Sequence, residues 1–137
     1  MPNIIKDGNI VADNWVVVED AEINSVAALP TGDLLLPLNV WQALSAELKD
    51  RNVGVWLNSD DSPLALKEHC ASLPLIAINF PAFADGRGYS YANVLRTQCG
   101  YKGELRAIGD VLKDQLTFMK RVGFNSFAIR SDLKLEE

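Results

Sequence analysis

The stretch LIAINFPAFADGRGYSYANVLRTQCGYKGELRAI, residues 75–108, decides the fold class. Its first six residues form a short apolar run, and residues 104–108 form a second short run, so both are predicted to be strands. Between them, Tyr91, Leu95 and Cys99 recur at helical spacing, which predicts a helix over residues 89–99. A strand, a helix and a strand in this order predict a β-α-β unit with two parallel strands.

The same alternation extends in both directions from this unit. Strands are predicted at residues 34–36, 53–57 and 124–129, and helices at residues 37–50, 63–72 and 110–122. The pattern predicts an α/β fold with a mainly parallel sheet of about five strands and alternating helices. An open three-layer sheet and half of a (β/α) barrel both satisfy it, and we favour the open sheet. The half barrel would need a partner to close, which implies a homodimer. Both architectures place ligands at the carboxyl ends of the strands.

The N-terminal segment is predicted to be β structure. Residues 3–6 and 9–12 flank Asp7-Gly8, a dipeptide typical of tight hairpin turns, and residues 15–18 predict a third strand. We therefore expect a single α/β domain with three parts. These are an N-terminal β arm with a hairpin and an acidic loop (1–33), a βα-repeat core (34–130) and an acidic tail (131–137).

Composition excludes several classes of protein. The 137 residues are 48% hydrophobic and 23% charged, which is typical of a soluble globular protein. No apolar run approaches the roughly 18 residues of a membrane helix, and no secretory signal is visible. The two cysteines argue against a disulfide scaffold and suit a reducing cytoplasm. The single histidine, His69, argues against a metal centre, and the net charge of −5 argues against nucleic-acid binding.

Charge is unevenly distributed along the chain. Residues 1–85 carry 4 Lys/Arg against 12 Asp/Glu, whereas residues 86–131 carry 8 against 3. Either these charges mix on a solvated surface, or the basic part marks a local anion site.

The loop before the helix at residues 89–99 holds the first candidate site. Gly86 and Gly88 bracket Arg87 and allow close approach of a ligand to the backbone, where amides at a helix start bind oxyanions. Arg87 can pair with a carboxylate, sulfate or phosphate through two hydrogen bonds, and Tyr89 follows directly. Asp85 is a candidate base or a partner that orients Arg87. The alternative is a tight strand-to-helix turn whose amides Asp85 satisfies.

The turn after the strand at residues 104–108 holds the second candidate site. Arg106 lies inside the strand and needs a partner or a ligand if both faces of the sheet are covered. Gly109 precedes Asp110, which is either a helix N-cap or a second candidate base. Gln115 falls within the apolar arc of the predicted helix, so its amide must reach a backbone group, a polar partner or the site.

These two stretches, FADGRGYS at residues 83–90 and GYKGELRAIGDVLKDQ at residues 100–115, resemble the bacterial domain-of-unknown-function 934 family. The resemblance covers roughly residues 30–130. Members of that family are commonly labelled probable oxidoreductases or proteins of sulfite reduction, because of their usual placement beside sulfite reductase and phosphoadenylylsulfate reductase. The resemblance implies a cytoplasmic role in sulfur assimilation and carries over no catalytic residue.

Three functions are consistent with the sequence. The first is an accessory protein of assimilatory sulfate and sulfite reduction, which binds an anionic ligand, or sulfite reductase or another sulfur-assimilation enzyme, at the carboxyl ends of the strands. The second is a small independent enzyme acting on a phosphate- or sulfate-bearing substrate, and the third is a non-catalytic assembly subunit. The chain carries no recognisable flavin, nicotinamide, haem or iron–sulfur signature, so the sequence identifies no cofactor. An oxidoreductase role would need a borrowed cofactor or a partner enzyme.

Overall fold

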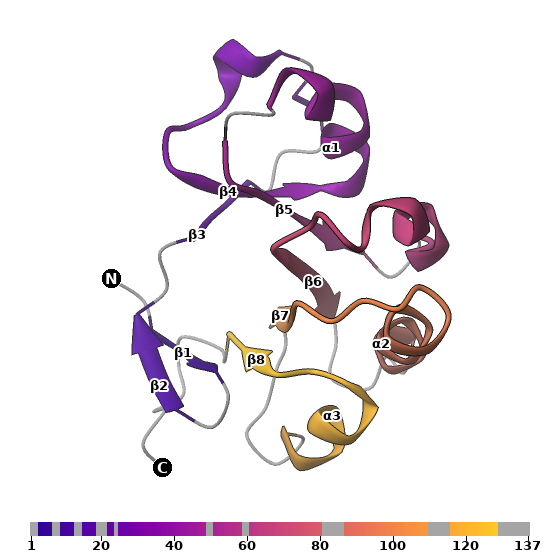
Figure 1. Cartoon of the computed structure of the whole chain (residues 1–137). Helices are drawn as coiled ribbons and strands as arrows, with labels where there is room; N and C mark the ends of the chain where they lie inside the picture. Colours follow the sequence, from indigo (N-terminus) through magenta and orange to yellow (C-terminus); the bar gives the residue numbers. More distant parts are fainter. Residues whose placement is uncertain are drawn as a thin grey trace.

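One curled β-sheet runs through the chain (Figure 1). The structure is a computed structural model that describes residues 3–6, 9–12, 15–18, 22–23, 25–48, 51–58, 61–80, 87–109 and 116–128. Across the described residues the sheet has eight strands, in the order β2-β1-β8-β7-β6-β5-β4-β3. Their bounds are β1 (Asn3–Lys6), β2 (Asn9–Ala12), β3 (Trp15–Val17), β4 (Asp33–Pro37), β5 (Val53–Leu57), β6 (Leu75–Phe80), β7 (Glu104–Gly109) and β8 (Ser126–Phe127).

The sheet is mainly parallel, as the sequence predicts. Strands β3 to β8 pair in sequence order and all in parallel, whereas β1 pairs antiparallel with both β2 and β8. The expected count of about five strands is wrong, because the N-terminal arm joins the sheet at both edges instead of standing apart. The β1–β2 hairpin extends the edge beside β8, and β3 adds a parallel strand beside β4. The turn at Asp7-Gly8 and the tail at 131–137 lie outside the described residues.

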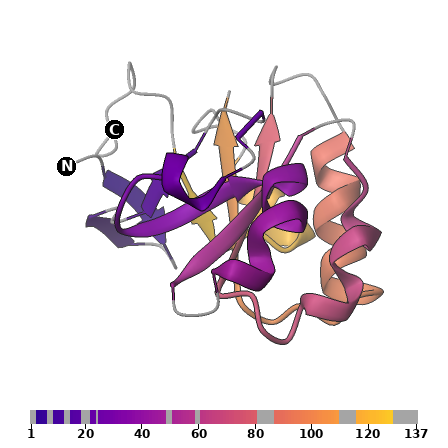
Figure 2. The same ribbon diagram turned by 90° about the horizontal axis from the view of Figure 1, so that it is seen from above.

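The helices lie on one side of the sheet, at its convex face (Figures 1 and 2). They are α1 (Leu38–Leu44), α2 (Arg87–Thr97) and α3 (Leu116–Val122), together with the 3₁₀ segments η1 (Val26–Ala28), η2 (Ser45–Glu47) and η3 (Pro63–His69). The open three-layer sheet that we favour from sequence is therefore wrong, and the curled half barrel describes the molecule. Crossovers between parallel strands are right-handed, so strands that advance in one direction carry all of their helices on one face.

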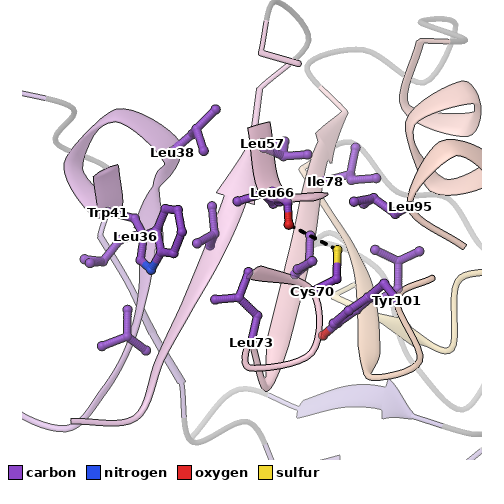
Figure 3. Packing of buried hydrophobic residues seen from close by; sticks show 14 of the residues in the cluster. Leu36, Leu38, Trp41, Leu57, Leu66, Cys70, Leu73, Ile78, Leu95 and Tyr101 are labelled. Atoms are coloured by element: carbon purple, nitrogen blue, oxygen red, sulfur yellow. Dashed lines mark hydrogen bonds between the residues drawn. The ribbon is translucent and has the colours of Figure 1, made fainter. Parts of the chain in front are cut away.

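The convex face and the helices enclose the larger hydrophobic core (Figure 3). Leu36, Leu57 and Ile78 project from successive strands toward Trp41 of α1 and Leu66 of η3, and all five are buried. In Figure 3 the thiol of Cys70 points at the carbonyl oxygen of Leu66, to which it donates a hydrogen bond of 3.2 Å. Burial, with Cys99 close by, raises the pKa of the Cys70 thiol to about 11, so this thiol is protonated and inert at neutral pH.

The concave face alternates large and small side chains from strand to strand. Leu35, Gly54 and Leu75 occupy neighbouring positions on β4, β5 and β6, and one layer further Ala77 stands between Trp56 and Arg106. A Cβ atom on Gly54 would lie 2.6 Å from the carbonyl oxygen of Leu75 and 3.2 Å from a methyl group of Leu35. The glycine therefore lets Leu35 and Leu75 close over β5, which permits the curl.

Candidate functional site

The carboxyl ends of β6 and β7 lie side by side. Phe80, the last residue of β6, is in register with Gly109, the last residue of β7. The segments that follow these strands, 81–86 and 110–115, therefore leave the sheet from neighbouring positions at one edge. Asp85, Gly86, Asp110 and Gln115 lie outside the described residues, so their proposed roles stay predictions.

The helix α2 begins at this same edge. Arg87 and Gly88 are its first two residues, two positions earlier than the sequence predicts, and the structure describes them by their backbone alone. Tyr89 is half-buried, and its ring lies 5.3 Å from that of Phe80, centroid to centroid. Tyr89 thus packs into the core on the convex face. Its predicted contact with a ligand stays a prediction.

Arg106 is buried on the concave face and bound to protein groups. Its side chain is 2% exposed, and Nη2 lies 2.7 Å from Oε2 of Glu104. Its Nε donates to the same carboxylate at 3.2 Å and to the hydroxyl of Ser126 at 3.0 Å. Glu104 also pairs with Lys6 of β1 at 3.1 Å. This chain of charges ties β1, β7 and β8 together, and it directs Arg106 toward the start of β7, away from the carboxyl-terminal edge.

These partners act on the pKa of Glu104. Burial alone would raise its pKa, but the hydrogen bond and charge of Arg106, with smaller contributions from Ser126 and Lys6, leave the pKa of Glu104 lower than its usual value. The sequence indicated that an arginine inside a covered sheet needs a partner, and Glu104 meets that need. Whether Arg106 also contacts a ligand stays a prediction.

Arg96 likewise serves the fold. Its Nε donates to the carbonyl oxygen of Gly123, and its Nη1 donates to those of Tyr101 and Gly103, each at 2.9 Å. Burial lowers the pKa of this guanidinium. Arg96 therefore fastens the end of α2 to the segments that precede β7 and follow α3. Part of the positive charge in residues 86–131 is thus held by backbone carbonyl oxygens.

A small cavity opens at the carboxyl-terminal edge of the concave face. It has a volume of about 220 Å³ and is lined by Val17, Trp56, Asn79 and Ile108, which come from β3, β5, β6 and β7. In parallel α/β sheets this edge is where ligands bind. The pattern along the chain pointed to none of these four residues as part of a site. Asn79 carried a usable signal, because it is the one polar residue in the run LIAINF.

Glycine at position 109 makes room for the polar group of this cavity. Gly109 has φ +88°, and a Cβ atom there would collide with Oδ1 of Asn79 and stand 2.5 Å from the carbonyl oxygen of Phe80. Nδ2 of Asn79 donates to Oδ1 of Asn58, which follows β5, at 3.2 Å. Gly109 therefore has a definite geometric role, since it lets the end of β7 close against Asn79. Its predicted contact with a ligand stays a prediction.

Two larger cavities lie at the opposite, amino-terminal edge. One of about 380 Å³ includes Trp41, Arg51 and His69 in its lining, and another of about 430 Å³ includes Cys70 and Lys102. The helices end at this edge, and their C-terminal dipoles disfavour anions there. Among the residues described here, no group of three or more His, Cys, Asp or Glu side chains could hold a metal ion. Across the same ranges, no helix is long and apolar enough to cross a membrane.

The curled, mainly parallel sheet and the cavity at the carboxyl ends of its strands define an α/β protein of half-barrel type with a candidate small-molecule site. A family model described as "Bacterial protein of unknown function (DUF934)" matches residues 54–137, which is more than half of the chain. The chain belongs to this family. The match includes β5 from its second residue, β6 to β8, α2 and α3, and with them both candidate segments. Neither the curated proteins nor the solved structures gave a match.

Proposed function

We propose that this chain is a cytoplasmic accessory protein of assimilatory sulfate and sulfite reduction, and that it binds an anionic ligand at the carboxyl ends of its strands. The observation that carries the binding part is the meeting of three features at one edge. The ends of β6 and β7 are paired there, α2 begins there with Arg87, and the cavity beside Asn79 opens there. The pathway assignment rests on the resemblance carried by residues 83–90 and 100–115.

The start of α2 favours an anion over a cation at this edge. Its first backbone N–H groups have no partner within the helix, and eleven residues give it an aligned dipole that is positive at this end. Arg87 adds a full positive charge at the first helical position. A sulfite reductase polypeptide or another sulfur-assimilation enzyme would be the natural partner at the same edge, since the ligand would have to pass between the two proteins.

Replacing Arg87 with alanine is expected to weaken anion binding without weakening the fold. The variant should lose most of the thermal stabilisation that sulfite or sulfate gives to the parent protein, while its melting temperature without ligand changes by less than about 1 °C. Differential scanning calorimetry across a series of anion concentrations measures both quantities. Lys102→Ala, at the opposite edge of the sheet, is the matched control and should keep the full response. An undiminished response of Arg87→Ala would remove Arg87 from the site.

Deletion of the gene is expected to impair growth on sulfate but not on cysteine. Sulfite as the third sulfur source narrows the step, because growth on sulfite places the requirement before sulfite and failure places it between sulfite and cysteine. The control is the deletion strain carrying the parent gene on a plasmid. Equal growth of the deletion strain on all three sources, in a strain with no second copy, would contradict the pathway assignment.

A further inference from the structure

Among the described residues that line the cavity at the carboxyl-terminal edge, apolar side chains predominate. They are Val17, Trp56 and Ile108, which stand beside Asn79. The indole Nε1 of Trp56 donates to the carbonyl oxygen of Val18 at 2.9 Å, which uses the only polar atom of that side chain and holds the ring in place. A bare inorganic anion gains nothing from such walls and would lose hydration on entering. The walls suit a flat apolar surface that packs against the indole.

Asn79 gives the cavity one polar anchor of defined chemistry. Within the described part of the chain its amide makes one hydrogen bond, from Nδ2 to Oδ1 of Asn58. One N–H and the carbonyl oxygen have no hydrogen-bond partner among the described residues, and one side of this oxygen packs against Gly109. An amide pairs through two hydrogen bonds with an edge that carries an amine donor beside a ring-nitrogen acceptor, which is how asparagine binds adenine.

The size of the cavity limits the part of a ligand that it can hold. Its volume of about 220 Å³ is below the roughly 300–1,000 Å³ of pockets that hold whole drug-sized ligands. It is suited to one ring system, with the remainder of the ligand outside. The edge at which the cavity opens is also the edge where α2 begins.

We propose that the cavity formed by Val17, Trp56, Asn79 and Ile108 binds an adenine-type heteroaromatic ring, and that this ring belongs to the anionic ligand. The ring packs against the indole of Trp56 and pairs its amine and ring nitrogen with the Asn79 amide. The anionic group then lies outside the cavity, toward Arg87 at the start of α2. The placement of the anion rests on the proposed function, whereas the ring site stands on the cavity alone.

Titration of the full chain with adenosine, AMP and inorganic phosphate tests the proposal. Isothermal titration calorimetry should show AMP binding more tightly than adenosine, and adenosine more tightly than phosphate. Equal affinities for adenosine and AMP would uphold the ring site and contradict the anion site. Binding of phosphate as tight as that of AMP, with none of adenosine, would uphold the anion site and overturn the ring. Absence of binding by adenosine and AMP would overturn the ring proposal.

Two exposed neighbours on β3 provide matched variants that locate the ring. Val17 and Val16 are 39% and 38% exposed, and successive residues of a strand point to opposite faces, so of the two only Val17 lines the cavity. Val17→Arg should lower the affinity for adenosine about tenfold or more, and Val16→Arg less than about twofold. Asn79→Leu should lower it by about tenfold, since one paired edge is lost. Unchanged affinity in Val17→Arg, with the variant folded by circular dichroism, would place adenosine elsewhere and overturn the assignment.

Discussion

Replacing Glu104 with glutamine is expected to lower the free energy of unfolding by about 3 kcal/mol at neutral pH. The reason is the burial of the pair: Glu104 is 11% exposed and Arg106 is 2% exposed, so the guanidinium loses its ion-pair partner in a place that water barely reaches. Urea unfolding followed by circular dichroism measures the loss. Lys6→Gln is the matched control, because Lys6 pairs with the same carboxylate but is 44% exposed, and its loss should stay below about 1 kcal/mol. Equal losses in the two variants would contradict a dominant role for Arg106.

The pH dependence of the stability difference between the parent protein and Glu104→Gln tests whether the charge of Glu104 causes that difference. In the folded protein burial acts to raise the pKa of Glu104, but the hydrogen bond and charge of Arg106, together with Ser126 and Lys6, leave this pKa lower than its usual value. A group with a lowered folded pKa contributes stability above its unfolded pKa, and this contribution is lost as pH falls through the folded pKa. The difference in stability between the parent protein and Glu104→Gln should therefore be full at pH 7 and shrink as the pH falls below about 4. A difference that stays constant down to pH 3 would show that lost packing is the cause.

Replacing Gly109 with alanine is expected to lower the free energy of unfolding by about 2–4 kcal/mol. Two costs add: the positive φ of +88°, and the overlap of the new Cβ with Oδ1 of Asn79 and the backbone of Phe80. Gly100→Ala separates them, because Gly100 has φ +69° with no atom within 4 Å of the added Cβ. This control carries only the backbone cost of about 1–2 kcal/mol. Equal destabilisation of the two variants, measured by urea unfolding, would mean that the end of β7 does not close tightly on Asn79.

The elements whose bounds the sequence predicted correctly are those whose hydrophobic pattern depends only on neighbouring residues. Strands at residues 3–6, 9–12, 53–57 and 75–80 have the predicted bounds, since each is a short run ended by turn-forming or polar residues. The helix expected over residues 37–50 is instead α1 followed by η2, because helical spacing alone does not separate a long α-helix from a shorter one that ends in a 3₁₀ turn. Of the last strand, expected over 124–129, the structure describes residues 124–128, and within them β8 covers residues 126–127.

The curl of the sheet could not be predicted from local sequence patterns. Leu34, Leu35 and Leu36 are fully buried on both faces of β4, and such a run is equally consistent with a sheet covered by helices on both sides. Which strands are neighbours decides between the two, and that depends on contacts between distant segments. Gly54 was the available signal, since a glycine in the middle of an apolar strand marks a close approach of its neighbours.

The candidate site, like the fold, could be predicted from the sequence only where it depends on neighbouring residues of the chain. The sequence placed both candidate sites after strands, and the pairing of Phe80 with Gly109 shows that these two strands end next to each other. The sequence also indicated that Arg106 needs a partner. It did not identify that partner as Glu104, which lies two residues earlier on the same face of the strand. The cavity itself joins residues from four strands, with Val17 and Ile108 separated by 91 positions in sequence, so a pattern along the chain could not reveal it.

The two outermost strands of the sheet, β2 and β3, are neighbours in the sequence. Ala12 ends β2 and Trp15 begins β3, so three peptide units join the opposite edges of an eight-stranded sheet and hold these residues within about 11 Å of each other. This short link therefore holds the two edges of the sheet near each other. Exposed strand edges are templates for aggregation, and this short tether keeps both of them in one region of the molecule. Cleavage of the backbone there would free both edge strands at once. Self-association of the protein should therefore follow such a cut more readily than a cut elsewhere on the surface.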